Sequence, residues 1–287
     1  VGNIRRITST MEKIARSRFA RSLRRATASK PYTDGIFELV RQIAANSGGI
    51  THPLITGAAD TGKPGKDLTL ILTSDRGLCG PYNGAILRLV MQHLRAEPAA
   101  KAGEIELVGK KGQAFLKYNN IGVSKTYTLG DKADFADAER IAQSYMDRFI
   151  SGEIRRVNVV YMRFFSAGRQ KPEIMQLLPL QSPASQTSAS QTPVPGAEKT
   201  AKVEYEFSPP APELLGTLLP AAVKGSLFQA VLDAIVSEHI ARMVAMKSAT
   251  DNAGKMGKKL TRQFNRARQA QITTELTEII SGAAALE

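Results

Sequence analysis

The feature that most constrains this fold is a long C-terminal segment without proline. No proline occurs from residue 221 to residue 287, and apolar residues recur there at helical intervals, beginning with Leu227, Val231 and Ile235. As a helix that rises about 1.5 Å per residue, the segment would extend about 100 Å, which exceeds the diameter of a single domain of this mass. Such a helix is stable only if something packs along it.

The N-terminal segment is the partner that we expect inside the chain. Residues 1–30 contain no proline and place apolar residues on one helical face; after Pro31, which can kink a helix, residues 32–45 resume the same period. We predict that the two terminal helices form a long antiparallel coiled coil. Beyond Lys247 the apolar stripe is poor in Leu and rich in Ala, Gly, Thr and Gln, so we expect another protein to house part of this rod.

The middle of the chain alternates between strand patterns and helix patterns. Runs of β-branched and aromatic residues predict strands, and apolar residues at helical spacing predict helices between them. The strands are expected at 67–73, 104–108, 156–165, 174–178 and 203–207, and the helices at 84–95, 112–118 and 133–150. This order predicts a small Rossmann-like α/β domain with a largely parallel sheet.

The fold class is therefore α/β, with a long coiled coil attached. We expect an N-terminal shaft helix at 1–55, an α/β foot domain at 56–207, and a C-terminal shaft helix at 208–287 that pairs with the first. Residues 181–200 consist mostly of Ser, Gln, Thr and Pro, which cannot bury enough apolar surface to become ordered. We predict a flexible loop there, extending over 181–202.

Positive charge is concentrated in the two shaft segments. The formal net charge is +13, and residues 1–30 hold nine basic side chains and one acid, while 242–268 hold eight basic side chains and one acid. Such a face can be merely solvated, or it can contact nucleic acid, anionic lipid or an acidic protein. No window of 18 consecutive apolar residues occurs, so we expect no membrane-spanning segment.

We find no pattern that predicts catalysis, a metal site or a cofactor site. The phosphate-binding pattern G-x-x-x-x-G-K-[ST] is absent, and one cysteine with three histidines cannot form a Cys-rich zinc site. The sequence Arg76-Gly77-Leu78-Cys79-Gly80 follows a predicted strand, where it is either a tight turn or a loop whose amides bind an anion. Cys79 has no histidine within twelve residues to activate it as a nucleophile.

Several motifs carry a family resemblance. They lie at residues 7–15, 30–32, 75–80, 237–252 and 272–284, and the last of these contains the pattern I-T-x-E-x-x-[DE]-x-x-x-G-A in full. Across essentially its whole length the chain resembles the gamma subunits of F-type ATP synthases. Two departures stand out: the chain lacks the cysteine pair of the chloroplast regulatory insert, so thiol switching is not expected, and it begins inside the family's N-terminal helix.

The resemblance implies a non-catalytic rotor shaft. The coiled coil would penetrate a ring of three alpha and three beta subunits, and the α/β domain would sit with epsilon on the membrane c-ring. Proton or sodium flow would turn the shaft and drive each beta site through its catalytic states. The complex would lie at the cytoplasmic face of the bacterial inner membrane or at the organellar equivalent, with this chain peripheral to the membrane.

The resemblance also implies contact residues, carried over by position. Met11 and Lys13 would face an acidic loop of beta, with Arg242 at the same level on the other helix, although Met11 could equally be ordinary packing in the seam. Near the tip, the beta contacts would be Arg268, Gln269, Thr273 and Glu275. Contact with the rotor ring or epsilon would come from Glu204, Tyr205 and Glu206.

Two other classes of function remain at this point. A basic coiled coil that binds nucleic acid would use the same helices, although 6% aromatic residues and no Trp argue against base stacking. An α/β enzyme would need a pocket with paired acid and base groups, which the sequence does not show.

Overall fold

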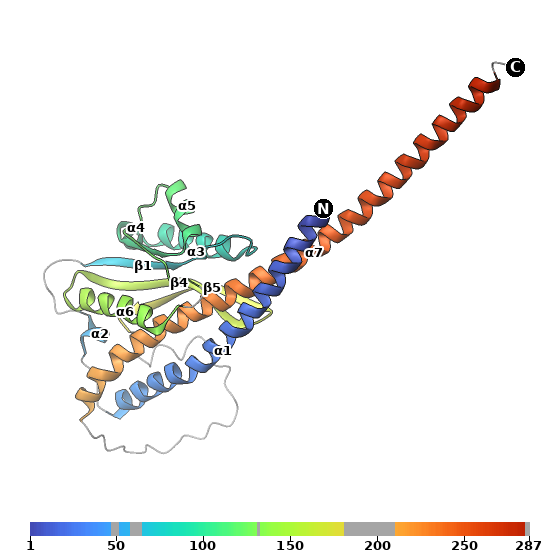
Figure 1. The fold of residues 1–287 in the computed structure, drawn as a ribbon. Coiled ribbons are helices and arrows are strands. Elements are labelled where there is room, and N and C mark those ends of the chain that lie inside the picture. Colours follow the sequence, from blue (N-terminus) through green and yellow to red (C-terminus); the bar gives the residue numbers. More distant parts are fainter. Residues whose placement is uncertain (47–51, 58–64, 131–132, 181–209, 285–287) are drawn as a thin grey trace, which may run out of the picture.

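Two long helices form a shaft with a foot domain on one side (Figure 1). The computed structural model describes residues 1–46, 52–57, 65–130, 133–180 and 210–284. Helix α1 (Gly2–Asn46) runs beside helix α7 (Ala211–Ala284), and both continue through an internal proline, Pro31 and Pro220 respectively. The predicted two-helix shaft is confirmed. The loop predicted at 181–202 and the strand predicted at 203–207 lie outside the described residues.

The two shaft helices are antiparallel. Thr250 Oγ1 donates a hydrogen bond to Thr8 Oγ1 at 2.8 Å. A Cβ placed on Gly225 would lie 3.4 Å from Thr33 Oγ1, and one placed on Gly257 would lie 3.8 Å from Val1 Cγ1. Residue numbers therefore rise along α1 as they fall along α7, and α1 begins at the level of Gly257. Beyond that level α7 continues alone to the C-terminal end (Figure 1).

The foot contains a five-stranded sheet of order β3-β2-β1-β4-β5. All neighbours are parallel except β4 and β5, which form an antiparallel pair. The strands are β1 (Lys66–Leu72), β2 (Glu104–Val108), β3 (Lys125–Tyr127), β4 (Ile154–Ser166) and β5 (Arg169–Leu178). The expected largely parallel sheet is confirmed; the three-residue strand β3 was not predicted.

Helices cover both faces of the sheet, which is why β1 is buried nearly throughout. Leu68, Leu70 and Leu72 face the core shared with α6 (Phe135–Ile150) and α7, whereas Ile71 faces α3 (Tyr82–Ala96). The shorter helices are α2 (Pro53–Thr56), α4 (Pro98–Ala102) and α5 (Lys110–Tyr118). Leu54 of α2 is buried in the core of the foot, and Leu180 N donates to its carbonyl at 2.8 Å.

The foot and the lower part of α7 share one hydrophobic core. Leu227 and Val231 of α7 belong to the same buried cluster as the strand residues. Polar contacts reinforce this packing: Tyr82 Oη donates to Ala234 O at 3.2 Å, and Ser237 Oγ donates to Met162 O at 3.2 Å. One stretch of α7 is long and apolar enough to cross a membrane by composition, but over half of it is buried inside the protein, as in the core helix of a soluble domain.

Candidate functional site

The end of α7 is exposed on every side. All side chains from 258 to 282 are exposed, and several of them are large and apolar. These are Leu260, Phe264, Ile272, Leu276, Ile279 and Ile280, each 48% to 72% exposed. At about 1.5 Å per residue, this bare end projects about 40 Å past the start of α1. Large apolar side chains exposed in this number along one helix mark an interaction surface rather than a solvated one.

The four residues predicted near the tip lie on this bare end. Arg268, Gln269, Thr273 and Glu275 are all exposed. The hydrogen bonds recorded for them stay inside α7: Thr273 Oγ1 donates to Gln269 O at 2.9 Å, and Gln271 Nε2 donates to Glu275 Oε1 at 3.0 Å. Arg268 and Glu275 are seven residues apart, so they share one side of the helix. Their side chains are available to a partner.

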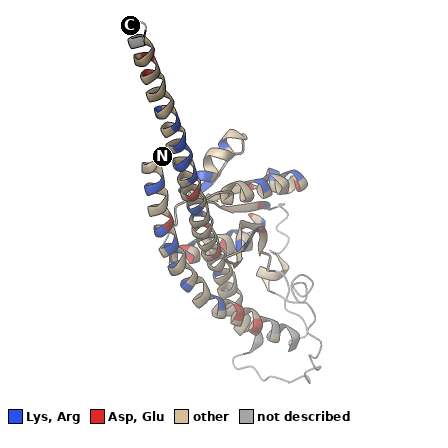
Figure 2. Cartoon of the chain, turned by 90° about the vertical axis from the view of Figure 1, so that its right-hand side faces the viewer, with Lys and Arg blue, Asp and Glu red and all other residues tan. Residues whose placement is uncertain are grey.

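The other predicted contact residues have different environments. Lys13 is exposed and Met11 is half-buried; Met11 lies about one turn from Thr8, in the direction of Arg242. The Arg242 side chain is only 9% exposed. Basic residues recur along α1 and along α7 at and beyond the level where α1 begins (Figure 2). Glu204, Tyr205 and Glu206 lie outside the described residues.

The loop at 74–80 follows β1 and lies against α7. Its inner side is held by Asn83 of α3, whose Oδ1 accepts from Ser74 N at 3.0 Å and whose Nδ2 donates to Ser74 Oγ at 2.7 Å and to Cys79 Sγ at 3.3 Å. Ser74 Oγ donates in turn to Arg76 O at 2.8 Å. Gly80 has φ +57°, and a Cβ placed on it would lie 3.5 Å from Ala245 Cβ of α7, so the backbone approaches the helix closely.

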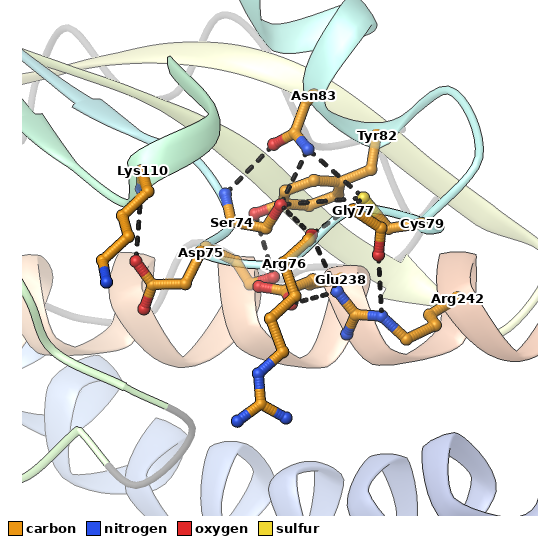
Figure 3. Close-up of polar contacts among 11 residues, drawn as sticks. Ser74, Asp75, Arg76, Gly77, Cys79, Tyr82, Asn83, Lys110, Glu238 and Arg242 are labelled. Carbon is orange, nitrogen blue, oxygen red and sulfur yellow. Dashed lines mark hydrogen bonds and ion pairs between the residues drawn. The ribbon is translucent and has the colours of Figure 1, made fainter. Parts of the chain in front are cut away.

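Arg242 of α7 holds the outer side of this loop (Figure 3). Its Nη2 donates to Arg76 O at 3.1 Å, and its Nε donates to Gly77 O at 3.4 Å. The same Nη2 pairs with Glu238 Oε1 at 2.7 Å, one turn earlier on α7. The described contacts therefore make 74–80 a turn whose carbonyls face a cation, rather than a loop whose amides face an anion.

A cavity of about 100 Å³ lies beside the loop. It is bounded by the ends of β1 and β2 and by α7, with Asp75, Arg76 and Glu238 on its wall. This volume accommodates a few water molecules and is below the size of small-molecule pockets. Burial, reinforced by the negative charge of Glu238, raises the pKa of Tyr82, which keeps its hydroxyl neutral beside the cavity.

Metal and catalytic chemistry find no support in the described part of the chain. Among the residues that the structure places, no three His, Cys, Asp or Glu side chains are grouped to hold a metal ion. Cys79 is a buried free thiol, 3% exposed, and accepts a hydrogen bond from Asn83. The histidines in α3 and α7, His93 and His239, are buried.

Sequence reasoning missed Glu238 and the carbonyls of the 74–80 loop. The spacing of four between Glu238 and Arg242 is a recognisable helical pair, and it could have indicated that Arg242 has a partner inside its own helix. Nothing in the sequence showed that backbone carbonyls 165 residues away complete the arrangement.

Comparisons with known proteins are consistent across sequence and fold. The family model described as ATP synthase matches residues 1–286. The ATP synthase gamma chain of Rhodopirellula baltica is 39% identical over 289 residues, covering 100% of this chain and 95% of that protein.

Two solved structures share the fold. A chain of the Tetrahymena thermophila mitochondrial ATP synthase central stalk and c-ring is similar with a TM-score of 0.59 at 20% identity, covering 85% of this chain and 99% of that one. A chain of the Euglena gracilis mitochondrial ATP synthase is similar with a TM-score of 0.58 at 21% identity, covering 97% and 95% of the two chains.

Proposed function

The chain is a member of the ATP synthase gamma-chain family, and from this premise we propose how it acts as the central rotor shaft of an F-type ATP synthase. It is a non-catalytic subunit, because bond formation between ADP and phosphate takes place in the beta subunits. The observation that carries the proposal is the bare end of α7, which is continuous with a helix packed into the foot and exposes large apolar side chains. That geometry suits a rod whose tip is enclosed by other subunits.

The packing supports a mechanism in which torque enters at the foot. The foot shares its core with the lower part of α7, so a turn of the foot turns the helix as well. The tip then presents different side chains to each surrounding subunit in succession. A thin, Ala- and Thr-rich tip can turn inside a sleeve without the interlocking packing of knobs into holes.

The complex supplies the partners. The family places this chain in a membrane-associated synthase that contains a catalytic head and a c-ring. We propose three alpha and three beta subunits around the shaft and an epsilon subunit beside the foot. We also propose the cytoplasmic face of a bacterial inner membrane as the location, with the chain held there through the complex.

Specific contacts follow from position. We propose that Met11 and Lys13 lie near an acidic loop of beta, at about the level of Arg242, because basic residues recur along this part of the shaft (Figure 2). The residues proposed to meet beta at the tip are Arg268, Gln269, Thr273 and Glu275. Those proposed to contact the rotor ring or epsilon are Glu204, Tyr205 and Glu206.

Co-expression with alpha and beta subunits tests this function. We expect the full chain to co-purify with both and to be protected by them along the bare end of α7, while the purified chain alone hydrolyses no ATP. A chain ending at residue 257 is the matched control, since it keeps the packed core and removes only the bare end. Recovery of nucleic acid in place of alpha and beta, lost steeply with salt, would instead favour the coiled coil that binds nucleic acid.

A further inference from the structure

Arg242 is a cation with three acceptors inside its own chain. The guanidinium is held between Glu238 of α7 and two carbonyls of the 74–80 loop, and its side chain is 9% exposed. An ionised side chain is costly to bury unless it is paired and hydrogen-bonded, and here both conditions are met. The contact joins two parts of the molecule that are remote in sequence: the loop after the first strand of the foot, and the shaft helix.

The loop carries two exposed side chains. Arg76 is exposed, and Leu78 is 60% exposed with φ +63°. A leucine in the left-handed region is uncommon and carries a conformational cost, and its exposure returns no burial energy. The conformation persists because the surroundings hold it: Asn83 and Ser74 bind the loop from the foot, and Arg242 binds it from the shaft.

We propose that Arg242 is a positioning residue that fastens the 74–80 loop to α7. It thereby fixes the position along α7 and the orientation of Arg76 and Leu78. It also holds the foot against α7 at the carboxyl end of β1. This inference rests on the proposed function, since the fixed loop matters for rotation. Arg242 then acts on coupling through the loop, and its guanidinium is not itself the group offered to a partner.

The identity of the residue fits this role. Arginine carries five donors in a rigid fork, so one side chain can bind a carboxylate and two carbonyls together, whereas lysine is a single point charge that is strongly hydrated. The close approach of Gly80 to Ala245, one turn further along α7, places the loop where the fork can reach it.

Cys79 provides a built-in reporter for the fastening. It is the only cysteine of the chain, it is 3% exposed, and it belongs to the same loop. When the loop lifts from α7, the thiol becomes accessible to a maleimide reagent. The rate of alkylation of the peptide that contains Cys79, followed by mass spectrometry, therefore measures how often the loop opens.

The experiment compares Arg242→Ala, Arg242→Lys and Glu238→Gln with a matched control, Arg140→Ala. Arg140 is a foot arginine whose side chain is 76% exposed, so its removal changes the net charge equally without touching the loop. In the full chain we expect Arg242→Ala to raise the alkylation rate about tenfold or more, Arg242→Lys and Glu238→Gln to raise it less, and Arg140→Ala to leave it within about twofold. Far-UV circular dichroism verifies that each variant is folded; if Arg242→Ala is not, Glu238→Gln carries the test.

The same variants are then assembled with alpha and beta subunits and the membrane rotor. We expect Arg242→Ala to lower the number of ions transported per ATP while ATP hydrolysis is retained, with partial rescue in Arg242→Lys. An unchanged alkylation rate in Arg242→Ala overturns the fastening, and faster alkylation with undiminished transport overturns its role in coupling. Failure of the parent chain to bind alpha and beta would overturn the proposed function, but the alkylation result on the chain alone would still stand.

Discussion

Residues 215–246 and residues 258–282 belong to the same helix, yet they are stabilised by different means. In the first segment, Leu219, Val223, Leu227 and Val236 are at most 1% exposed and pack against the foot or α1. In the second segment every side chain is exposed, because α1 does not extend beyond the level of Gly257. The lower segment derives its stability from the fold of this chain, and the upper segment must derive it from outside.

The difference teaches that continuity of a helix does not imply continuity of its stability. A single helix in water is marginal, because each turn gains little beyond its own hydrogen bonds. The packed segment adds the burial of apolar side chains, whereas the bare segment leaves its apolar side chains in water. The family function makes sense of this arrangement, since the bare segment is proposed to lie inside a sleeve of other subunits.

The largest expected difference between the two segments is in amide hydrogen exchange. In the isolated chain we expect amides of 262–280 to exchange at least about 100-fold faster than those of 223–240, because only the latter need the foot to open. Mass spectrometry of the intact chain measures both segments in one sample. On assembly with alpha and beta, exchange in 262–280 should slow while 223–240 changes little. Equal protection of the two segments in the isolated chain would refute the comparison.

A pair of identical substitutions on α7 sharpens the contrast. Leu227 is 0% exposed and Leu260 is 48% exposed, so Leu227→Ala leaves a cavity and Leu260→Ala does not. We expect Leu227→Ala to lower the free energy of unfolding by about 2 to 5 kcal/mol. Leu260→Ala should change it by less than about 0.5 kcal/mol, since leucine and alanine also have similar helix propensities. Urea unfolding followed by circular dichroism decides; a similar loss in both variants would mean that the bare end is packed in solution.

The architecture could be predicted from the sequence because its main signals are repetitive. Helical spacing over dozens of residues indicated the shaft, and the alternation of strand and helix patterns indicated the parallel sheet. Short elements without such a period, α2, β3 and α4, were not predicted. Glu106 also looks like an exposed position on a strand, but it is buried and accepts hydrogen bonds from Tyr127 and Tyr145, which only the tertiary structure brings to it.

The candidate site was less predictable for a related reason. Arg268 and its neighbours are exposed because α7 is longer than α1 and extends beyond it. The environment of Arg242 depends on backbone carbonyls of Arg76 and Gly77, and carbonyl groups carry no sequence signal. A residue that is charged and lies on a helix was therefore expected to face a partner, while its described contacts lie within the chain.

Met11 of α1 lies beside the part of α7 that separates the two segments. A charge added there should affect function more than stability. Met11→Lys places an ammonium beside the proposed acidic loop of beta, where a partly desolvated ion pair worth about 1 to 3 kcal/mol would form in some rotary positions and not in others. We expect assembly and ATP hydrolysis to remain near normal and ion transport per ATP to fall. Met11→Leu is the control of similar size; normal transport by Met11→Lys would refute the assigned position.

The smallest expected effect concerns a carboxylate in the packed segment. Burial raises the pKa of Asp233, although hydrogen bonds from Gln229 and the Phe164 backbone and the charges of Arg163 and Lys30 act against this. A carboxyl whose pKa is higher in the folded state than in the unfolded state costs stability when it is ionised. That cost is present above the folded pKa and disappears as pH falls below the unfolded pKa.

Asp233→Asn should therefore stabilise the fold slightly near neutral pH, because the amide oxygen can still accept from Gln229, which lies 2.9 Å from the carboxylate. The advantage over the parent should shrink as pH falls through the raised pKa and vanish under acidic conditions where the unfolded carboxyl is also protonated. Asp251→Asn, at an exposed position of α7, removes the same charge and serves as the control. Urea unfolding of all three proteins from pH 3 to pH 8 gives the answer. If Asp233→Asn were less stable than the parent at neutral pH, the attractions of Arg163 and Lys30 would outweigh the cost of burying the Asp233 carboxylate. The packed part of α7 would then tolerate a partly buried charge that the limited exposure of Asp233 alone predicts to be destabilising.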